Sequence, residues 1–283
     1  MDSFLHNIIL QPMNRSLQDK VVLITGASLG IGKALAFDAL ARGARVAVCA
    51  RDIGKLNETF KNVHEQDIFK FQLDVADEQA CYAFVAQTIN KFGKIDMLLN
   101  NAGMSMRALF EDLDVKVLKQ LMDVNFWGTV YMTKAALPYI KRSKGVILGV
   151  SSIAGYRGLP GRTGYSSSKY AMQGFMEALR TELLRTGVHV MWVCPGYTTS
   201  NIRNTALGEK GQPMRETNMD ESKMMSPEAC ARIILDGVKK RKRTIIMTTQ
   251  GKLTVWVNKL FGGLADKLVY KHYLKEGDLN LPE

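Results

Sequence analysis

The 283-residue sequence predicts an α/β fold: a doubly wound, seven-stranded parallel sheet with helices on both faces, in a single domain with a C-terminal helical tail. Three observations predict this fold. Short runs of Val, Ile and Leu recur without polar alternation, as in strands buried on both faces of a parallel sheet. Segments that combine an apolar stripe with a polar face lie between these runs. The chain length is that of a single open α/β domain.

Parallel strands need crossover connections, so the segments between the runs are expected to be helices. Two examples are Lys33–Arg42, which ends before Gly43 as a helix C-terminus should, and Glu78–Phe92. The domain is predicted to span residues 20–250, after an N-terminal extension of residues 1–19. The predicted strands are Val21–Ile24, Arg45–Cys49, Ile68–Leu73, Ile95–Leu99, Val146–Val150, Val188–Val193 and Thr244–Met247.

The composition limits the class of protein and its location. With 46% hydrophobic and 23% charged residues, the chain is expected to be a soluble globular protein. The net charge of +11 favours anionic partners, but no nucleic-acid-binding motif is present, so no nucleic-acid partner is expected. The apolar stretch Phe4–Leu10 lacks a basic leader and is too short to span a bilayer. A cytoplasmic location is predicted, with peripheral membrane contact as a second option.

Cysteine and histidine spacing predicts neither disulfides nor a metal site. The cysteines form no CxxC pair and are expected to be free, buried thiols: Cys49, Cys81, Cys194 and Cys230. The histidines lack metal-ligand spacing and are expected to be surface or strand residues: His6, His64, His189 and His272.

The first predicted strand runs into the segment TGASLGIG, residues 25–32, and a helical pattern follows. Gly26, Gly30 and Gly32 allow a tight turn and close backbone approach, so that a pyrophosphate can sit on the free amides of the helix N-terminus. Ser28 and Ile31 lie in the same turn. Such a turn can also be purely structural, so its meaning depends on the rest of the chain.

A second motif can transfer a proton. Tyr165 and Lys169 are four residues apart and therefore share one face of a helix. A free tyrosine is a weak base at neutral pH, and a nearby cation corrects this by stabilising the phenolate. Ser152, thirteen residues before Tyr165 and at the end of the fifth predicted strand, can donate to a carbonyl oxygen. Together these side chains are suited to protonating an alkoxide or deprotonating an alcohol.

These motifs follow the order found in the short-chain dehydrogenase/reductase family, which the chain resembles from about Lys20 to Met247. The resemblance rests on the TGxxxGxG turn, the NNAG segment 100–103, the serine with YxxxK, and Pro195-Gly196. It implies a Rossmann-type fold that transfers a hydride between a nicotinamide and a ketone or secondary alcohol. Here Tyr165 would be the acid or base.

Roles for further residues follow from the same resemblance. Lys169 would lower the pKa of the tyrosine and hold the nicotinamide ribose, and Ser152 would polarise the substrate. Asn125 would support a proton-relay water, with the alternative that it satisfies a helical irregularity. The implied cofactor contacts are Gly26, Ser28, Gly30, Ile31, Gly32, Arg51, Asp74, Val75, Asn101, Ala102, Gly103, Tyr165, Lys169, Pro195, Gly196 and Thr198.

The end of the second strand indicates which nicotinamide cofactor fits. An acidic residue there accepts hydrogen bonds from a free ribose hydroxyl, whereas the planar fork of Arg51 suits a 2′-phosphate. NADP(H) is therefore favoured over NAD(H). Asp52 could instead pair with Arg51 or contact a hydroxyl, and position 29 is Leu where many NADP(H) members have a second basic residue.

The substrate is expected to be a small-molecule ketone or alcohol of apolar, lipid-like or steroid-like character. The irregular stretch 198–226 is the predicted substrate loop, and its four methionines would either line a pliable pocket or pack on the core: Met214, Met219, Met224 and Met225. The chain resembles the branch of the family with 11-beta-hydroxysteroid dehydrogenases, acyl-dihydroxyacetone-phosphate reductases and 3-ketosphinganine reductases.

The tail, residues 251–283, contains an amphipathic pattern over Leu253–Lys275 that has three interpretations. It could lie on a membrane, pack on a neighbouring subunit, or cover the substrate cleft. Residues 125–141 and 165–185 correspond to helices by which family members assemble, so a homodimer or homotetramer is expected. A different class of function, an NADP(H)-binding regulatory or scaffold protein, would have no need for the Tyr165/Lys169 pair.

Overall fold

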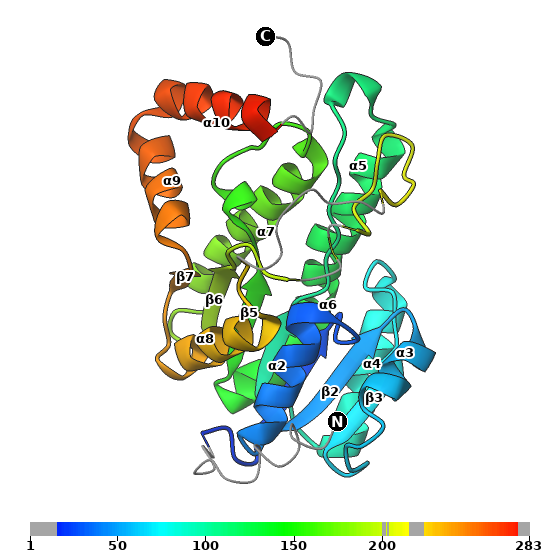
Figure 1. Ribbon diagram of the computed structural model, residues 1–283. Coiled ribbons are helices and arrows are strands. Elements are labelled where there is room, and N and C mark those ends of the chain that lie inside the picture. The colour runs from blue at the N-terminus through cyan, green and yellow to red at the C-terminus, as the bar shows by residue number, and fades with distance from the viewer. Residues whose placement is uncertain (1–15, 200–201, 203, 215–223, 277–283) are drawn as a thin grey trace.

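The computed structural model describes residues 16–199, 202, 204–214 and 224–276. Its seven strands form one parallel sheet in the order β3-β2-β1-β4-β5-β6-β7 (Figure 1). The predicted fold is therefore confirmed, and each predicted apolar run overlaps one strand. The strands are β1 Val21–Thr25, β2 Arg45–Ala50, β3 Ile68–Gln72, β4 Met97–Asn100, β5 Val146–Val150, β6 His189–Cys194 and β7 Thr244–Ile246.

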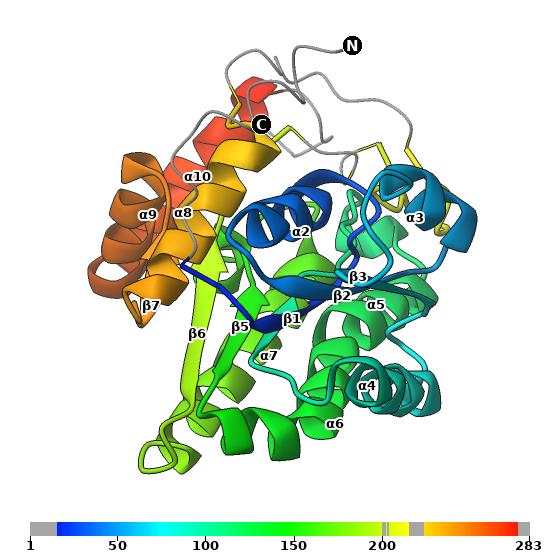
Figure 2. The same cartoon turned by 90° about the horizontal axis from the view of Figure 1, so that it is seen from below.

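Helices cover both faces of the sheet, as Figure 2 shows. Alternate strand residues point to opposite faces: Val22 and Ile24 pack with α2, α3 and α8, whereas Val21 and Leu23 pack with α4, α6 and α7. Burial on both faces explains why the strands lack polar alternation. The helices that flank the sheet are α2 Gly30–Ala41, α3 Ile53–Thr59, α4 Glu78–Phe92, α6 Gly128–Ser143, α7 Thr163–Glu182 and α8 Pro227–Lys239.

The predicted helices Lys33–Arg42 and Glu78–Phe92 correspond to α2 and α4, and only the start of α4 agrees with the prediction. Helix α4 has the predicted bounds because Asp77 caps its N-terminus, accepting from the Ala80 amide at 3.0 Å, and Gly93 ends it in the left-handed region. Helix α2 begins three residues before the predicted Lys33, since the glycine turn is itself its first turn. The short elements are η1 Phe110–Asp112, α5 Val115–Met122, the π-helical η2 Asp123–Trp127, and η3 Ile153–Gly155.

The helical tail is confirmed, but as two helices rather than one. Helix α9 spans Thr249–Leu260 and α10 spans Gly262–Glu276. The chain leaves helical geometry at Phe261, with φ −136° and ψ 60°, directly before two glycines, which are poor helix formers. Figure 1 shows α9 rising from the sheet and α10 turning back across the top of the molecule.

Three further expectations can be compared with the described residues. All four cysteines are buried and free, as predicted. Within the described ranges, no helix is both long and apolar enough to cross a membrane. Over the same ranges, no group of three His, Cys, Asp or Glu side chains is placed to hold a metal ion. Most of the predicted N-terminal extension, including His6, lies outside the described residues.

Candidate active site

A cavity of about 680 Å³ opens at the carboxyl ends of the strands, on the side where the strand order reverses between β1 and β4. The ends of the strands, the start of α7 and the tail helices contribute to its walls. All sixteen predicted cofactor residues line it, and so does Ser152. Asn125 is not among the described lining residues. The fold thus brings together motifs that lie far apart in the sequence.

The glycine turn has a geometry that side chains would prevent. Gly26 has φ +67°, and a Cβ there would lie 2.9 Å from the Ala102 Cα. A Cβ on Gly32 would lie 2.2 Å from the Gly26 carbonyl oxygen. No side chain caps the N-terminus of α2 at Leu29, so its first amides keep their donor capacity for an anion in the cavity. This donor set fits a pyrophosphate.

The asparagine of the NNAG segment holds that turn in place. Asn101 Nδ2 donates to the carbonyl oxygens of Thr25 at 2.8 Å and Gly26 at 3.1 Å. In return, the Thr25 hydroxyl accepts from the backbone amides of Asn101 at 3.0 Å and Ala102 at 2.9 Å. The ends of β1 and β4 are therefore locked together where the cavity begins.

Arg51 and Asp52 at the end of β2 have separate surroundings. Arg51 is exposed and lines the cavity. Asp52 caps α3 instead, because its Oδ1 accepts from the Lys55 amide at 2.9 Å. The alternative in which Asp52 pairs with Arg51 or contacts a ribose hydroxyl therefore finds no support in this geometry.

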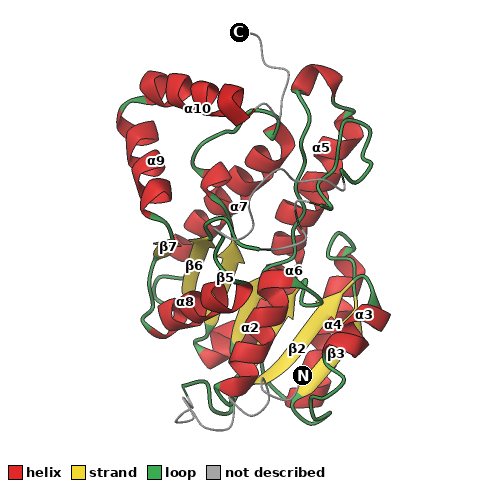
Figure 3. Ribbon diagram, viewed as in Figure 1, coloured by secondary structure: helices red, strands yellow, loops and turns green. Residues whose placement is uncertain are grey.

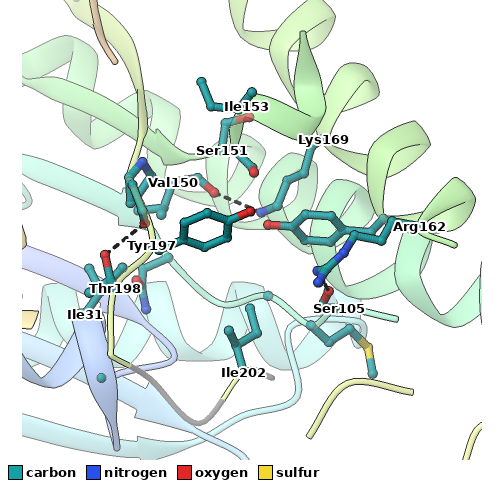
Figure 4. Close-up of a pocket in the computed structure, with 18 of the residues that line it drawn as sticks. Ile31, Ser105, Val150, Ser151, Ile153, Arg162, Lys169, Tyr197, Thr198 and Ile202 are labelled. Carbon is teal, nitrogen blue, oxygen red and sulfur yellow. Dashed lines mark hydrogen bonds between the residues drawn. The ribbon is translucent and has the colours of Figure 1, made fainter. Parts of the chain in front are cut away.

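Tyr165, Lys169 and Ser152 converge in the middle of the cavity. Lys169 Nζ lies 5.8 Å from the centroid of the Tyr165 ring and donates to the Val150 carbonyl oxygen at 2.9 Å. The Ser152 side chain hydrogen-bonds to Tyr165. Figure 4 shows Lys169 reaching from α7 toward Val150, with the Tyr197 ring beside its ammonium group. This arrangement can deliver a proton to an oxygen atom placed between Ser152 and Tyr165.

Burial shapes the acidity of this pair. Burial raises the pKa of Tyr165 above its usual value, although Ser152 and Arg162 act in the opposite direction. The sequence predicts a lowered tyrosine pKa, and the structure differs because desolvation outweighs its polar neighbours. Burial also lowers the pKa of Lys169 to about 8. Near neutral pH the phenol therefore stays protonated beside an ammonium that is mostly charged, which suits an acid.

Asn125 lies outside the described cavity lining and hydrogen-bonds to segments next to the site. Its side chain is fully buried in η2, where Oδ1 accepts from the Met104 amide at 2.8 Å. Its Nδ2 donates to the Met104 carbonyl oxygen at 3.0 Å and to Ser168 Oγ at 2.9 Å. Gly103 lies between Asn125 and Lys169, since a Cβ there would be 3.2 Å from Asn125 Oδ1 and 3.5 Å from Lys169 Nζ. The geometry agrees with the alternative of a polar residue that stabilises a helical irregularity.

The tail helices form part of the cavity wall, as in the cleft-covering interpretation. Arg157, in the loop after η3, connects to both of them: Nη1 donates to Asn258 Oδ1 at 3.1 Å, and Nη2 donates to Asp266 Oδ1 at 2.6 Å. Asn258 Nδ2 in turn donates to the Tyr156 carbonyl oxygen at 2.8 Å. These bonds attach α9 and α10 to the segment that begins at Ser152.

The predicted loop methionines contribute little to the described wall. Met225 packs on the core, its amide donates to the Tyr197 carbonyl oxygen at 2.9 Å, and it is not among the described lining residues. Met214 is exposed, and neither it nor Met224 is among the described lining residues. Met219 lies outside the described residues.

Some lining residues are not among the predicted site residues. Arg162 could have been found from its position one helical turn before Tyr165, whereas Ser105 and Leu159 have no local signal. His272, expected at the surface or in a strand, also lines the cavity. Residues of the predicted substrate loop and of the tail line it as well, among them Ile202, Thr205, Val257, Leu268, Val269 and Tyr273.

Comparisons with known proteins agree with this geometry. A family model described as short chain dehydrogenase matches residues 20–210. The chain is 37% identical to 11-beta-hydroxysteroid dehydrogenase 1A of Arabidopsis thaliana over 261 residues, which cover 89% of this chain and 74% of that protein. It is also 37% identical to human dehydrogenase/reductase SDR family member 7 over 227 residues, covering 77% and 67%.

A solved structure shares the fold. An alcohol dehydrogenase from the archaeon Thermococcus sibiricus, complexed with 5-hydroxy-NADP, superposes with a TM-score of 0.69 at 25% identity. The match covers 81% of this chain and 94% of the archaeal chain.

Proposed function

The chain belongs to the short-chain dehydrogenase/reductase family, an oxidoreductase family that acts on CH-OH and C=O groups, and we propose that it reduces an apolar, lipid-like ketone with NADPH. The same site would catalyse the reverse oxidation. The observation that supports this most is the convergence of Ser152, Tyr165 and Lys169 on one cavity with the glycine turn.

The residues present fit a dinucleotide. The uncapped amides of α2 at residues 30–32 would bind the pyrophosphate, and Asp74 and Val75 would flank the adenine. Arg51 would bind the 2′-phosphate, which supports NADP(H) over NAD(H) because Asp52 is occupied as a helix cap. When bound, the cofactor supplies the hydride. Lys169 would hold its nicotinamide ribose.

The chain's own residues would provide the proton. Ser152 would orient the substrate carbonyl by donating to its oxygen, and Tyr165 would transfer its phenolic proton to the same oxygen as negative charge develops there. The Lys169 ammonium would then stabilise the phenolate left behind. Asn125 would act as a positioning residue, since its bonds to Met104 and Ser168 fix the segments around the lysine.

The experiment that tests this function is a panel of steroid, sphingoid, acyl-glycerone and small aromatic ketones, each assayed with NADPH and with NADH. Turnover of an apolar ketone at higher kcat/KM with NADPH is the expected result. Tight NADPH binding with no turnover of any member would contradict it and favour a nucleotide-binding regulatory protein.

We also propose a homodimer or homotetramer that associates through α6 and α7. Two exposed aromatic side chains support this: Trp127, the last residue of η2 directly before α6, is 43% exposed, and Tyr170 on α7 is 44% exposed. Sedimentation velocity should give a mass of two or four chains. A single-chain mass at micromolar concentration would contradict the proposal.

The tail is proposed to touch membranes as well as to cover the cleft. Apolar side chains that are more than half exposed gather on α9, α10 and the residue between them: Leu253, Trp256, Leu260, Phe261, Leu264 and Leu268. Lysines lie along the same two helices, a combination typical of interfacial helices.

Changing exposed tail residues to acids should abolish membrane contact. The double variant Trp256→Glu/Phe261→Glu is expected to lose flotation with anionic liposomes. Each change removes an apolar side chain that would insert into the lipid interface and adds a negative charge that anionic lipid headgroups repel. Leu184→Glu is the matched control, since Leu184 is 76% exposed, lies just after the C-terminus of α7 and is outside the tail. Equal flotation of wild type and double variant would remove the membrane role.

A further inference from the structure

The groups that would carry out the proposed reaction lie on two separate pieces of the fold. Ser152 follows β5 and is the N-cap residue of η3, whereas Tyr165 and Lys169 are on α7. Hydride and proton transfer need the substrate carbonyl in one orientation, and a displacement of about 1 Å can cost about a hundredfold in rate. A bond that fixes η3 relative to α7 therefore affects how well the reacting groups are aligned.

The side-chain amide of Gln173 makes such a connection. Gln173 is on α7 and is 7% exposed. Its Nε2 donates to Ser151 Oγ at 2.8 Å and to the Ser152 carbonyl oxygen at 3.3 Å. The same nitrogen lies 3.8 Å from Cys194 Sγ at the end of β6. One amide thus joins α7 to the carboxyl ends of β5 and β6, beside the serine that would orient the substrate.

Helical spacing and a glycine allow the amide to reach this place. Gln173 is four residues after Lys169 and eight after Tyr165, so the three side chains lie on one face of α7. A Cβ on Gly155 would lie 2.4 Å from Gln173 Nε2, so a larger residue at the end of η3 would displace the amide. The Ser152 carbonyl oxygen also accepts from the Gly155 amide at 3.0 Å. The turn around the serine is therefore held from both sides.

Lys169 makes a second polar link between α7 and β5, through its bond to the Val150 carbonyl oxygen at 2.9 Å. However, Lys169 lines the cavity, and its ammonium would also bind the nicotinamide ribose and stabilise the phenolate, so ligands compete for its donors. Gln173 is not among the described lining residues, and a ligand in the cavity would leave its amide bonds in place. The Gln173 link is therefore the one expected to persist through the reaction.

We propose that Gln173 is a positioning residue for ketone reduction, because its amide holds Ser152 in a fixed place relative to Tyr165 and Lys169. This assignment rests on the proposed function and adds a residue to its site. Gln173 would touch neither substrate nor cofactor. Its contribution would pass through the Ser152 hydroxyl, so it should disappear when that hydroxyl is absent.

A double-mutant cycle between Gln173 and Ser152 tests the proposal. Methionine is close in size to glutamine but has no amide, so Gln173→Met should lower the single-turnover rate of ketone reduction about ten- to a hundredfold. In a Ser152→Ala background the same change should lower the rate less than about threefold, since the group that Gln173 positions is gone. Equal factors in the two backgrounds would overturn the proposal, and so would a Gln173→Met rate within about threefold of wild type.

A matched variant separates positioning from folding. Met176 is fully buried on the same helix and packs in the core, so Met176→Ala should lower Tm at least as much as Gln173→Met while its rate stays close to that of wild type. The Kd for NADPH should stay within about threefold in both variants, because neither side chain is among the described lining residues. A rate loss in Met176→Ala as large as that in Gln173→Met would assign the effect to stability and overturn the proposal.

A second variant covers the case in which Gln173→Met does not fold. Ser151→Ala removes the acceptor of the 2.8 Å bond and should show the same dependence on Ser152. A Ser151→Ala effect that is equal with and without the Ser152 hydroxyl would overturn the proposal while leaving ketone reduction intact. No reduction of any ketone by wild type would instead reject the proposed function, and the role of Gln173 with it.

Discussion

Replacing Tyr165 with phenylalanine is expected to lower kcat for ketone reduction by about a thousandfold, within the usual range for loss of a general acid. The change removes only the hydroxyl. Phenylalanine keeps the ring 5.8 Å from Lys169 Nζ, so the packing of α7 should not change. The dissociation constant for NADPH should stay within about threefold, because cofactor binding does not need the phenolic proton. Single-turnover kinetics and a fluorescence titration measure the two quantities.

A second tyrosine on the same helix provides the control. Tyr170 is 44% exposed, and its hydroxyl bonds to the Tyr156 carbonyl oxygen away from the cavity. Tyr170→Phe should therefore reduce ketones at close to the wild-type rate. A Tyr165→Phe variant that keeps more than about a tenth of wild-type kcat would rule out this phenol as the proton donor.

The change Arg51→Glu is expected to reverse the choice of cofactor. Loss of a bidentate arginine–phosphate contact and the new repulsion should lower kcat/KM for NADPH about a hundredfold. NADH should be affected little or even favoured, since a carboxylate at this position can accept from ribose hydroxyls. The ratio of kcat/KM for the two cofactors is the quantity to measure.

Arg51→Lys is the conservative control for this prediction. It keeps the charge but not the planar fork, so its preference for NADPH should lie between those of wild type and Arg51→Glu. The Asp52 cap is untouched in both variants, and α3 should stay folded. A wild-type enzyme that uses NADH as well as NADPH, or a ratio that does not move in Arg51→Glu, would contradict the role of Arg51.

Short sequence patterns predict the strands, helix α4 and the glycine turn of this protein well. The seven strands could be placed because strands buried on both faces need unbroken apolar runs, and α4 because Asp77 and Gly93 mark its ends. The glycine turn could be placed because Gly26 needs a left-handed backbone that other residues rarely adopt. Each of these signals lies within a few residues of the feature it determines.

Tertiary contacts determine the rest. The packing of α9 and α10 over the cavity involves Arg157, which lies about a hundred residues earlier and binds Asn258 and Asp266. The raised pKa of Tyr165 arises from burial by the whole site, whereas its spacing to Lys169 predicts the opposite direction. His272 enters the cavity wall only because of the same long-range packing.

The central claim is that this chain moves a hydride from NADPH to a ketone carbon while Tyr165 supplies the proton. The most direct measurement uses NADPH dideuterated at C4 of the nicotinamide, with the alcohol product analysed by mass spectrometry. One deuterium on the carbinol carbon for each NADPH oxidised is the expected result, with the signal nearly absent in Tyr165→Phe. NADPH oxidation without deuterium in the alcohol, or equal labelling by wild type and Tyr165→Phe, would contradict the claim.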